Sequence, residues 1–175
     1  NARKIDSSTS MVWSPNWDYL AYSSDKGITV LRADGTVKGN LDFDRSLPKS
    51  FTWSNDGTTL LMDLGFDGIF RYSVTSDELT IVTRGGWREY DHDPAYGPGD
   101  SRIAFVHHEW GNLADILVVN SKGEDRHVVS PRTYTTVGHD EELELAWLDE
   151  TRIAFMLSEQ GIVCLNIGTH EDSFV

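Results

Sequence analysis

The sequence reads Val12-Trp13-Ser14-Pro15-Asn16-Trp17-Asp18-Tyr19-Leu20-Ala21-Tyr22 near its start: an aromatic residue, a polar turn and an apolar run. The same pattern returns at residues 52–62, 95–105 and 146–155. Aligned on Trp13, Trp53, Tyr96 and Trp147, the copies are 40, 43 and 51 residues apart. A repeat with this period indicates that one supersecondary unit is stacked several times along the chain.

Each copy has the composition of a small antiparallel sheet. The aromatic residue ends one strand, a turn such as Ser-Asn-Asp-Gly follows, and the apolar run continues as a buried strand. A third strand is expected at residues 28–31, 69–72, 116–119 and 162–165. An outer strand is expected at residues 36–38, 79–82 and 125–129, while the fourth copy retains only residues 173–175.

No stretch places apolar residues at helical spacing over three turns, so the sequence predicts an all-β fold. The period is close to the ~40–45 residues of a four-stranded propeller blade. We therefore expect a β-propeller of about four four-stranded antiparallel blades in a single unit that spans residues 1–175. The blades are expected at about residues 9–40, 50–84, 92–130 and 143–175.

The best-formed copy is Asp91-His92-Asp93-Pro94-Ala95-Tyr96-Gly97-Pro98-Gly99-Asp100-Ser101-Arg102-Ile103-Ala104-Phe105. It resembles the blade of the TolB-type, WD-repeat-like (PD-repeat) β-propeller family, in which Asp-x-x-Pro-x-Trp-Ser-Pro-Asp-Gly precedes a small-and-aromatic apolar strand. The resemblance covers nearly the whole chain, and the fourth copy departs most because it lacks the Ser-Pro and the Gly of its turn. It implies a bacterial periplasmic scaffold, with the cytoplasm as the alternative location.

Propellers close with ~4–8 blades. The four copies therefore form a small ring, half of an eight-bladed ring made by a homodimer, or a fragment of a larger propeller. Closure of a small ring needs an outer strand from residues 3–8 or an extension of residues 173–175, because the fourth copy is short. We favour a fragment or an assembly of such pieces over a self-closed monomer.

Charge limits the classes of partner. The chain has 28 acidic and 15 basic residues, so its net charge is −13. This charge argues against nucleic acid or an anionic membrane surface as the ligand and suits a basic protein or a cation; solubility alone is the other interpretation. Apolar runs are only a few residues long, so no membrane insertion is expected. The single Cys164 lies in an apolar strand and is expected to be a buried small hydrophobic residue.

One loop face of the predicted propeller collects histidine and aromatic residues. In such blades, the loops that enter the first strand lie on the same face as the loops that join the second strand to the third. That face is expected to carry His92, His107, His108, His139, Trp87, Tyr90, Trp110 and Tyr134. Exposed aromatic residues among polar ones are typical of interface anchors, so these residues are the candidates for binding a protein or peptide.

Part of the same face has a second interpretation as a divalent metal site. Imidazole and carboxylate ligands are available from His92, His108, His139 and Asp93. Their spacing matches no metal motif, and no other cofactor is expected. The structural alternative is that Asp91 and Asp93 cap backbone amides in a turn.

No catalytic motif is present: the chain lacks Gly-x-Ser-x-Gly, His-Glu-x-x-His and a phosphate-binding Gly-Lys-Ser/Thr loop. We therefore expect a non-catalytic interaction module that binds a protein or peptide through one loop face. One alternative is a regulatory or substrate-gating propeller of a larger hydrolase. The other is a metal-dependent sugar-acid lyase or glycosidase site on the same face. The long connection at residues 130–143 is either functional or a tolerated insertion.

Overall fold

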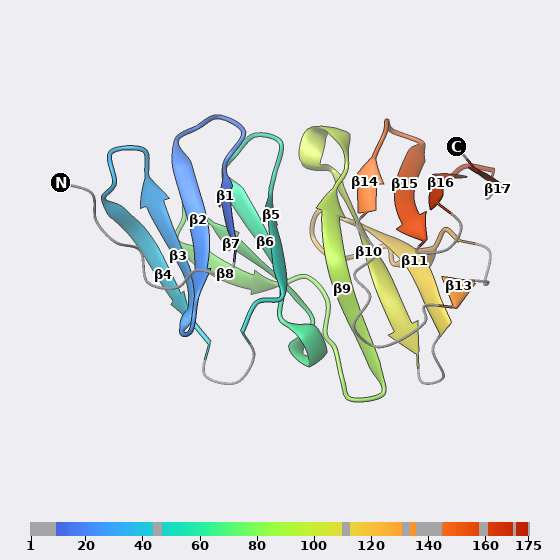
Figure 1. Ribbon diagram of the computed structural model, residues 1–175, viewed down its shortest axis with the longest axis horizontal. Helices are drawn as coiled ribbons and strands as arrows, with labels where there is room; N and C mark the ends of the chain where they lie inside the picture. Colours follow the sequence, from blue (N-terminus) through green and yellow to red (C-terminus); the bar gives the residue numbers. More distant parts are fainter. Residues whose placement is uncertain are drawn as a thin grey trace.

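A computed structural model describes residues 10–43, 47–109, 113–130, 134–135, 145–157, 161–169 and 171–174. These residues form four antiparallel sheets arranged side by side, with the two ends of the chain at opposite ends of the row (Figure 1). The described part of the chain is thus an open arc of four propeller blades. Its helical elements are two 3₁₀ turns, η1 (Gly65–Asp67) and η2 (Pro98–Asp100), and neither has the length or apolar character to cross a bilayer.

Each blade follows the chain from its inner to its outer strand. Blade 1 consists of β1 (Met11–Trp13), β2 (Tyr19–Ser24), β3 (Gly27–Arg32) and β4 (Val37–Asp42), and blade 2 of β5 (Ser50–Trp53), β6 (Thr59–Asp63), β7 (Ile69–Ser73) and β8 (Glu78–Ile81). Blade 3 consists of β9 (Glu89–Tyr96), β10 (Arg102–Glu109), β11 (Leu113–Asn120) and β12 (His127–Val128), with β13 (Tyr134–Thr135) also paired to β11. Blade 4 consists of β14 (Leu145–Trp147), β15 (Arg152–Leu157), β16 (Gly161–Asn166) and β17 (Glu171–Phe174).

The expected third strands are confirmed as β3, β7, β11 and β16. The expectation of a truncated fourth blade is wrong. Its outer strand β17 begins at Glu171 and pairs with β16 in the register Val163↔Phe174 to Asn166↔Glu171. Only residues 167–170 separate the two strands in the sequence. Residues 3–8, the other candidates for an outer strand, lie outside the described residues.

The hydrophobic core lies between successive blades. Alternate residues of one strand point to opposite faces, so the central strands serve two interfaces at once. In β6, Leu60 and Met62 pack against blade 1, whereas Leu61 packs against blade 3. In β10, Phe105 faces blade 2 and Val106 faces blade 4. This explains why these strands read as continuous apolar runs rather than as alternating patterns.

In blades 2 and 4, the repeated aromatic residue is a tryptophan that connects the blade to the preceding one. The indole Nε1–H of Trp53 donates to the Val12 carbonyl at 3.1 Å, and that of Trp147 donates to the Ala95 carbonyl at 3.2 Å. The acceptor is in both cases the residue that precedes the aromatic position of the neighbouring blade. Cys164, expected to be buried, is only half-buried because it lies on the face of β16 that points away from blade 3.

Candidate functional site

The β9–β10 hairpin of blade 3 carries most of the predicted site residues in its strands rather than in its loops. His92 lies within β9, and His107 and His108 lie near the end of β10. All three are buried, with 4–9% of each residue exposed. Tyr90, expected to be an exposed anchor, is also buried because it lies between Phe66 and His108. Polar residues thus extend the two strands well beyond the apolar run that marks them in the sequence.

A bulge in β9 redirects Asp93. Ala104 pairs with Ala95 and Val106 pairs with His92, so Asp93 and Pro94 together stand opposite the single residue Phe105. Asp93 adopts a left-handed conformation with φ of 49°. A regular strand would point consecutive side chains to opposite faces, whereas a bulge changes this direction locally. As a result, Asp93 Oδ2 lies 2.8 Å from Nδ1 of its neighbour His92.

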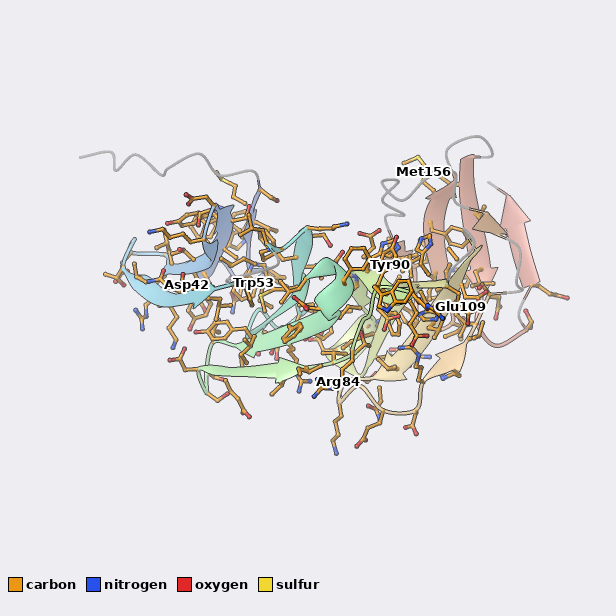
Figure 2. All side chains as sticks on the ribbon, turned by 90° about the horizontal axis from the view of Figure 1, so that it is seen from below. Asp42, Trp53, Arg84, Tyr90, Glu109 and Met156 are labelled. Atoms are coloured by element: carbon orange, nitrogen blue, oxygen red, sulfur yellow. The ribbon has the colours of Figure 1, made fainter. Side chains whose placement is uncertain are left out.

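Three rings stack on the face of the hairpin that carries His92. His108 is opposite Tyr90 across the strands, and their rings are nearly parallel at 5.1 Å. The His92 ring lies 4.8 Å from that of His108 and 5.4 Å from that of Tyr90. The stack holds the His92 imidazole in a fixed orientation. Seen from below, the labelled Tyr90 lies near the middle of the arc (Figure 2).

Asp63, the last residue of β6, brings a second carboxylate to His92 from blade 2. One ligand atom from each of Asp63, His92 and Asp93 lies within 4.8 Å of the others. Asp63 is 1% exposed, and its Oδ1 accepts a hydrogen bond from the Gly65 amide at 2.6 Å. Burial raises the pKa of Asp63, and the negative charge of Asp93 acts in the same direction. The three side chains have the composition of a site for a divalent cation.

The opposite face of the hairpin carries an ion pair. Asp91 is 1% exposed; its carboxylate accepts two hydrogen bonds from Arg126, at 2.8 and 3.1 Å. His107, directly across the strands, places Nδ1 at 2.7 Å from Asp91 Oδ1. Burial alone would raise the pKa of Asp91, but the hydrogen bonds of His107 and Arg126 and the Arg126 charge together lower it. Asp91 is thus fully engaged by interactions that hold the blade together.

The structure separates the remaining predicted residues. Trp87 is exposed, and the Arg88 guanidinium lies over its ring at 4.3 Å. Trp110 and His139 lie outside the described residues. Of Tyr134 only the backbone is described, and it pairs with Ala114 through β13. The binding roles predicted for these residues stay predictions.

An apolar groove lies beside the cluster of Asp63, His92 and Asp93. Its volume is about 500 Å³, and it runs over the inner strands of blades 2, 3 and 4 and one face of blade 4. It is lined by Ser50, Phe51, Thr52, Asp93, Pro94, Ala95, Leu145, Ala146, Ala154, Phe155, Met156 and Ile162. Among the described residues, the inner strands β5, β9 and β14 are sheet edges, each paired to one strand only. Asp93 belongs both to this groove and to the cluster with Asp63 and His92.

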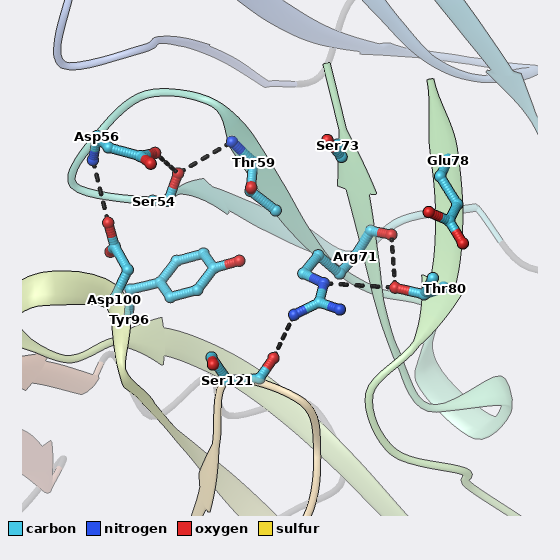
Figure 3. A pocket seen from close by; sticks show the side chains of 10 residues that line it. All are labelled: Ser54, Asp56, Thr59, Arg71, Ser73, Glu78, Thr80, Tyr96, Asp100 and Ser121. Carbon is cyan, nitrogen blue, oxygen red and sulfur yellow. Dashed lines mark hydrogen bonds between the residues drawn. The ribbon is translucent and has the colours of Figure 1, made fainter. Parts of the chain in front are cut away.

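A second pocket, of about 320 Å³, lies between blades 2 and 3 at the ends of the β5–β6 and β9–β10 turns (Figure 3). Two of its charged groups, Asp100 and Arg71, form hydrogen bonds between the blades. Asp100 Oδ1 accepts from the Asn55 amide at 2.7 Å, while Arg71 donates to the Ser121 carbonyl and to Thr80 Oγ1. The polar residues of this pocket are thus explained by the contact that they make between the two blades.

The sequence singles out neither Asp63 nor Arg126 as a site residue, although residues 63–67 are expected on the same loop face as the histidines. Asp63 is a single acidic residue at the end of an apolar strand, and Arg126 lies in a polar turn before β12. Asp63 meets the hairpin of blade 3 only in three dimensions, because β6, the second strand of blade 2, packs against β9, the inner strand of blade 3.

The fold and the inter-blade packing define an arc of a β-propeller, and the similarity to solved structures is at the level of this fold. Solved structures similar to the chain include an oligogalacturonate lyase in complex with manganese (TM-score 0.69, 11% identity, 93% of this chain and 50% of that chain). A tricorn protease is also similar, with a TM-score of 0.74 and 9% identity over 98% of this chain and 22% of that chain. A putative TolB from Agrobacterium tumefaciens has a TM-score of 0.61 and 16% identity over 94% of this chain and 63% of that chain. The chain thus spans between 22% and 63% of the length of these proteins. No family model and no curated protein matches its sequence.

Proposed function

We propose that the chain is a non-catalytic propeller module that binds an extended peptide segment of a partner protein in the groove over β5, β9 and β14. The groove itself carries this proposal. It is lined mostly by apolar residues and is large enough for several side chains. It is bordered by strand edges whose outer side is open to further pairing within the described part of the chain. An extended peptide can add to such an edge through its main chain while its alternate side chains fill apolar hollows.

The charge of the chain defines the chemistry of the peptide. A net charge of −13 attracts a basic segment and repels an acidic one. Asp93 stands at the border of the groove, where a Lys or Arg side chain of the ligand can reach it. We therefore expect a ligand with alternating apolar residues and at least one basic residue.

The proposal is tested by selecting from random 12-residue peptides displayed on phage and titrating the enriched peptide by fluorescence anisotropy. The variant is Ala146→Arg, which puts a bulky positive charge on the groove face of β14, where Ala146 stands opposite Ala154. The control is Ala33→Arg, the same change at an exposed turn in blade 1. We expect a loss of affinity of about tenfold or more for Ala146→Arg, with unchanged binding for Ala33→Arg.

Light scattering on the same variants separates peptide binding from blade packing. If no peptide is enriched, and Ala146→Arg instead abolishes self-association of the chain, then the groove face of blade 4 is where another blade packs. That outcome overturns the proposal. Peptide binding that is equally strong in both variants overturns it as well.

A second candidate is the regulatory or substrate-gating propeller of a larger hydrolase. It is supported by the similarity to the tricorn protease and to a dipeptidyl peptidase 4 from Porphyromonas gingivalis (TM-score 0.68, 10% identity, 94% of this chain and 32% of that chain). A hydrolase domain in the same polypeptide would favour this candidate. The third candidate, a sugar-acid lyase, is supported by the similarity to the oligogalacturonate lyase and would show as cleavage of oligogalacturonate.

A further inference from the structure

Blade 1 exposes the face that the other three blades bury. We call it the rear face, because in those blades it packs against the preceding blade. In blade 2 it carries Trp53 and Leu60, which stand opposite each other and are 6% and 0% exposed. Trp13 and Leu20 have the same place in blade 1, yet Trp13 is 41% exposed and Leu20 is half-buried. Blade 1 is one end of the row of sheets, so no described blade covers its rear face (Figure 1).

The rear face of blade 1 has the same residue types as the rear face of blade 4. One cross-strand row is a tryptophan followed by two aliphatic residues, and the next is an apolar, an aromatic and a β-branched residue. These rows are Trp13–Leu20–Leu31 and Met11–Tyr22–Thr29 in blade 1, and Trp147–Ile153–Leu165 and Leu145–Phe155–Val163 in blade 4. In blade 4, all of these residues pack against blade 3. The rear face of blade 1 is therefore suited to a partner face like that of blade 3.

Blade 4 presents such a face at the other end of the row. The forward face of a blade, which receives the next blade, has small inner residues and larger aliphatic ones beside them in blades 3 and 4. The rows are Ala95–Ala104–Val118 and Val106–Ile116 in blade 3, and Ala146–Ala154–Cys164 and Met156–Ile162 in blade 4. Val106 and Ile116 are buried against blade 4, whereas Met156 and Ile162 are 54% and 48% exposed. The two ends of the row thus carry the two halves of one inter-blade contact.

We propose that a second copy of this chain covers both end faces, so that two four-bladed arcs close an eight-bladed ring. Blade 4 of each copy packs against blade 1 of the other. The Trp13 indole then donates to the Ala146 carbonyl of the other copy, as Trp53 and Trp147 donate to the preceding blade within the chain. Propellers close with ~4–8 blades, so two arcs of four are enough for a ring. A head-to-tail contact that closes in this way leaves no end face exposed.

Charge also favours a second copy over a basic partner for these two faces. The rows on the rear face of blade 1 and the forward face of blade 4 contain no charged residue, although the chain has a net charge of −13. A basic protein would find no counter-charge there, whereas apolar surface on both sides gains by leaving water. Because the rest of each chain is acidic, two copies repel each other at low salt. Added NaCl is therefore expected to strengthen the association.

This inference goes beyond the proposed function and does not depend on it. The second copy covers Met156 and Ile162 at one end of the peptide groove. The inner strands of a propeller surround its central channel, so the part of the groove over β5 and β9 stays open in the ring. Trp13 and Cys164 do not line the groove. Variants at these two positions therefore test the ring separately from peptide binding.

The experiment is sedimentation velocity at chain concentrations up to about 100 µM, where a contact with a micromolar Kd is occupied. Trp13→Arg and Cys164→Arg each block one end face, and the control Leu79→Arg changes an exposed apolar residue in the outer strand β8. The wild type and Leu79→Arg are expected to reach the mass of two 19.7 kDa chains. Each end-face variant should dimerise about tenfold more weakly or worse. Circular dichroism melts show whether each variant is folded.

An equal mixture of the two end-face variants identifies the head-to-tail contact. Trp13→Arg keeps an intact blade 4 face and Cys164→Arg keeps an intact blade 1 face, so the mixture can form one intact contact and regain the mass of two chains. A contact between two blade 1 faces would be broken by Trp13→Arg alone and would not be restored by mixing. The wild-type Cys164 thiol gives a readout without a variant: its reaction with a maleimide should slow as the chain concentration rises, because the second copy covers it.

The proposal is overturned if the wild type remains a monomer at about 100 µM. It is also overturned if Cys164→Arg dimerises like the wild type, if the mixture of folded variants stays monomeric, or if assemblies grow beyond two chains. Association that weakens in added NaCl would show an electrostatic contact and overturn it too. A dimer that binds no peptide would contradict the proposed function alone.

Discussion

Replacing Asp91 by asparagine removes the negative charge that holds one face of the β9–β10 hairpin together. Asp91 is 1% exposed and accepts hydrogen bonds from both Arg126 and His107. The Asp91→Asn side chain would keep the shape of the original, but its amide would turn one acceptor oxygen into a donor that faces the Arg126 guanidinium. The variant therefore leaves a buried hydrogen-bonding network without its central acceptor.

The magnitude follows from the exposure of the two partners. Removing one member of a fully buried ion pair costs about 3–5 kcal/mol, because the remaining charge is left unpaired away from water. Arg126 has 38% of its side chain exposed, so its guanidinium can recover part of its hydration. We therefore expect a loss of about 2–3 kcal/mol in the free energy of unfolding. For a chain of this size, this corresponds to a fall of about 4–12 °C in melting temperature.

The assay is urea unfolding of the wild type and Asp91→Asn at several pH values, with Asp18→Asn as the control at an exposed carboxylate. The pKa of Asp91 is lowered in the folded protein, so its contribution is complete above its unfolded pKa of about 3.9. It is lost as the pH falls through the lower, folded pKa. The difference between wild type and Asp91→Asn should be constant from pH 7 to about pH 5 and should shrink below about pH 4.

A double-mutant cycle with Arg126→Met tests the origin of the effect. In the Asp91→Asn background, Arg126→Met should lower the free energy of unfolding only a little further, because the carboxylate that pairs with Arg126 is already gone. A loss below about 0.5 kcal/mol for Asp91→Asn at pH 7, comparable to a surface change, would refute the reasoning. A loss that persists unchanged at pH 3 would refute the assignment of the effect to the ionised carboxylate.

Two glycines and two tryptophans give further contrasts, all measured by urea unfolding. Gly27→Ala should cost more than about 3 kcal/mol, because φ is +147° and a Cβ would lie 1.9 Å from the Leu41 carbonyl oxygen. Gly35→Ala, with φ of +82° and open space around it, should cost only about 1–2 kcal/mol; equal losses would contradict the steric explanation. Trp53→Phe should cost about 1–2 kcal/mol because it removes the inter-blade hydrogen bond to Val12. Trp13→Phe, at an exposed position of blade 1, should cost less than about 0.5 kcal/mol at concentrations where the chain is a monomer, and a larger loss there would mean that Trp13 is covered within the single chain.

The sequence predicts the blades well because the signals that mark them are local. The aromatic residue, the turn and the apolar run recur within each copy, and β7 at Ile69–Ser73 nearly coincides with the expected residues 69–72. The same local signals fail where polar residues continue a strand. The sequence pattern places His92, His107 and His108 in loops, but cross-strand pairing with a neighbouring strand holds them in the sheet. The outer strand β17 is longer than expected for a related reason, since Glu171 and Asp172 have little strand preference of their own.

The candidate site is predictable only in part, because it depends on contacts between blades. The sequence indicates His92 and Asp93 as neighbours, and these two do contact each other. It does not single out Asp63, which is 29 residues before His92 and matches no metal-binding spacing. It also suggests His108 as a metal ligand, whereas His108 stacks on His92 and is not among the three residues of the cluster.

The bulge in β9 is what divides the acidic residues of this strand between two roles. In an uninterrupted strand, Asp91 and Asp93 would point to the same face, because side chains repeat every two residues. Both carboxylates would then compete for Arg126 and His107, and His92 would stand alone on the other face. The extra residue turns Asp93 toward His92 while Asp91 keeps its pairing with Arg126 and His107. One carboxylate thus stabilises the blade, and the other joins Asp63 and His92 at the boundary with blade 2.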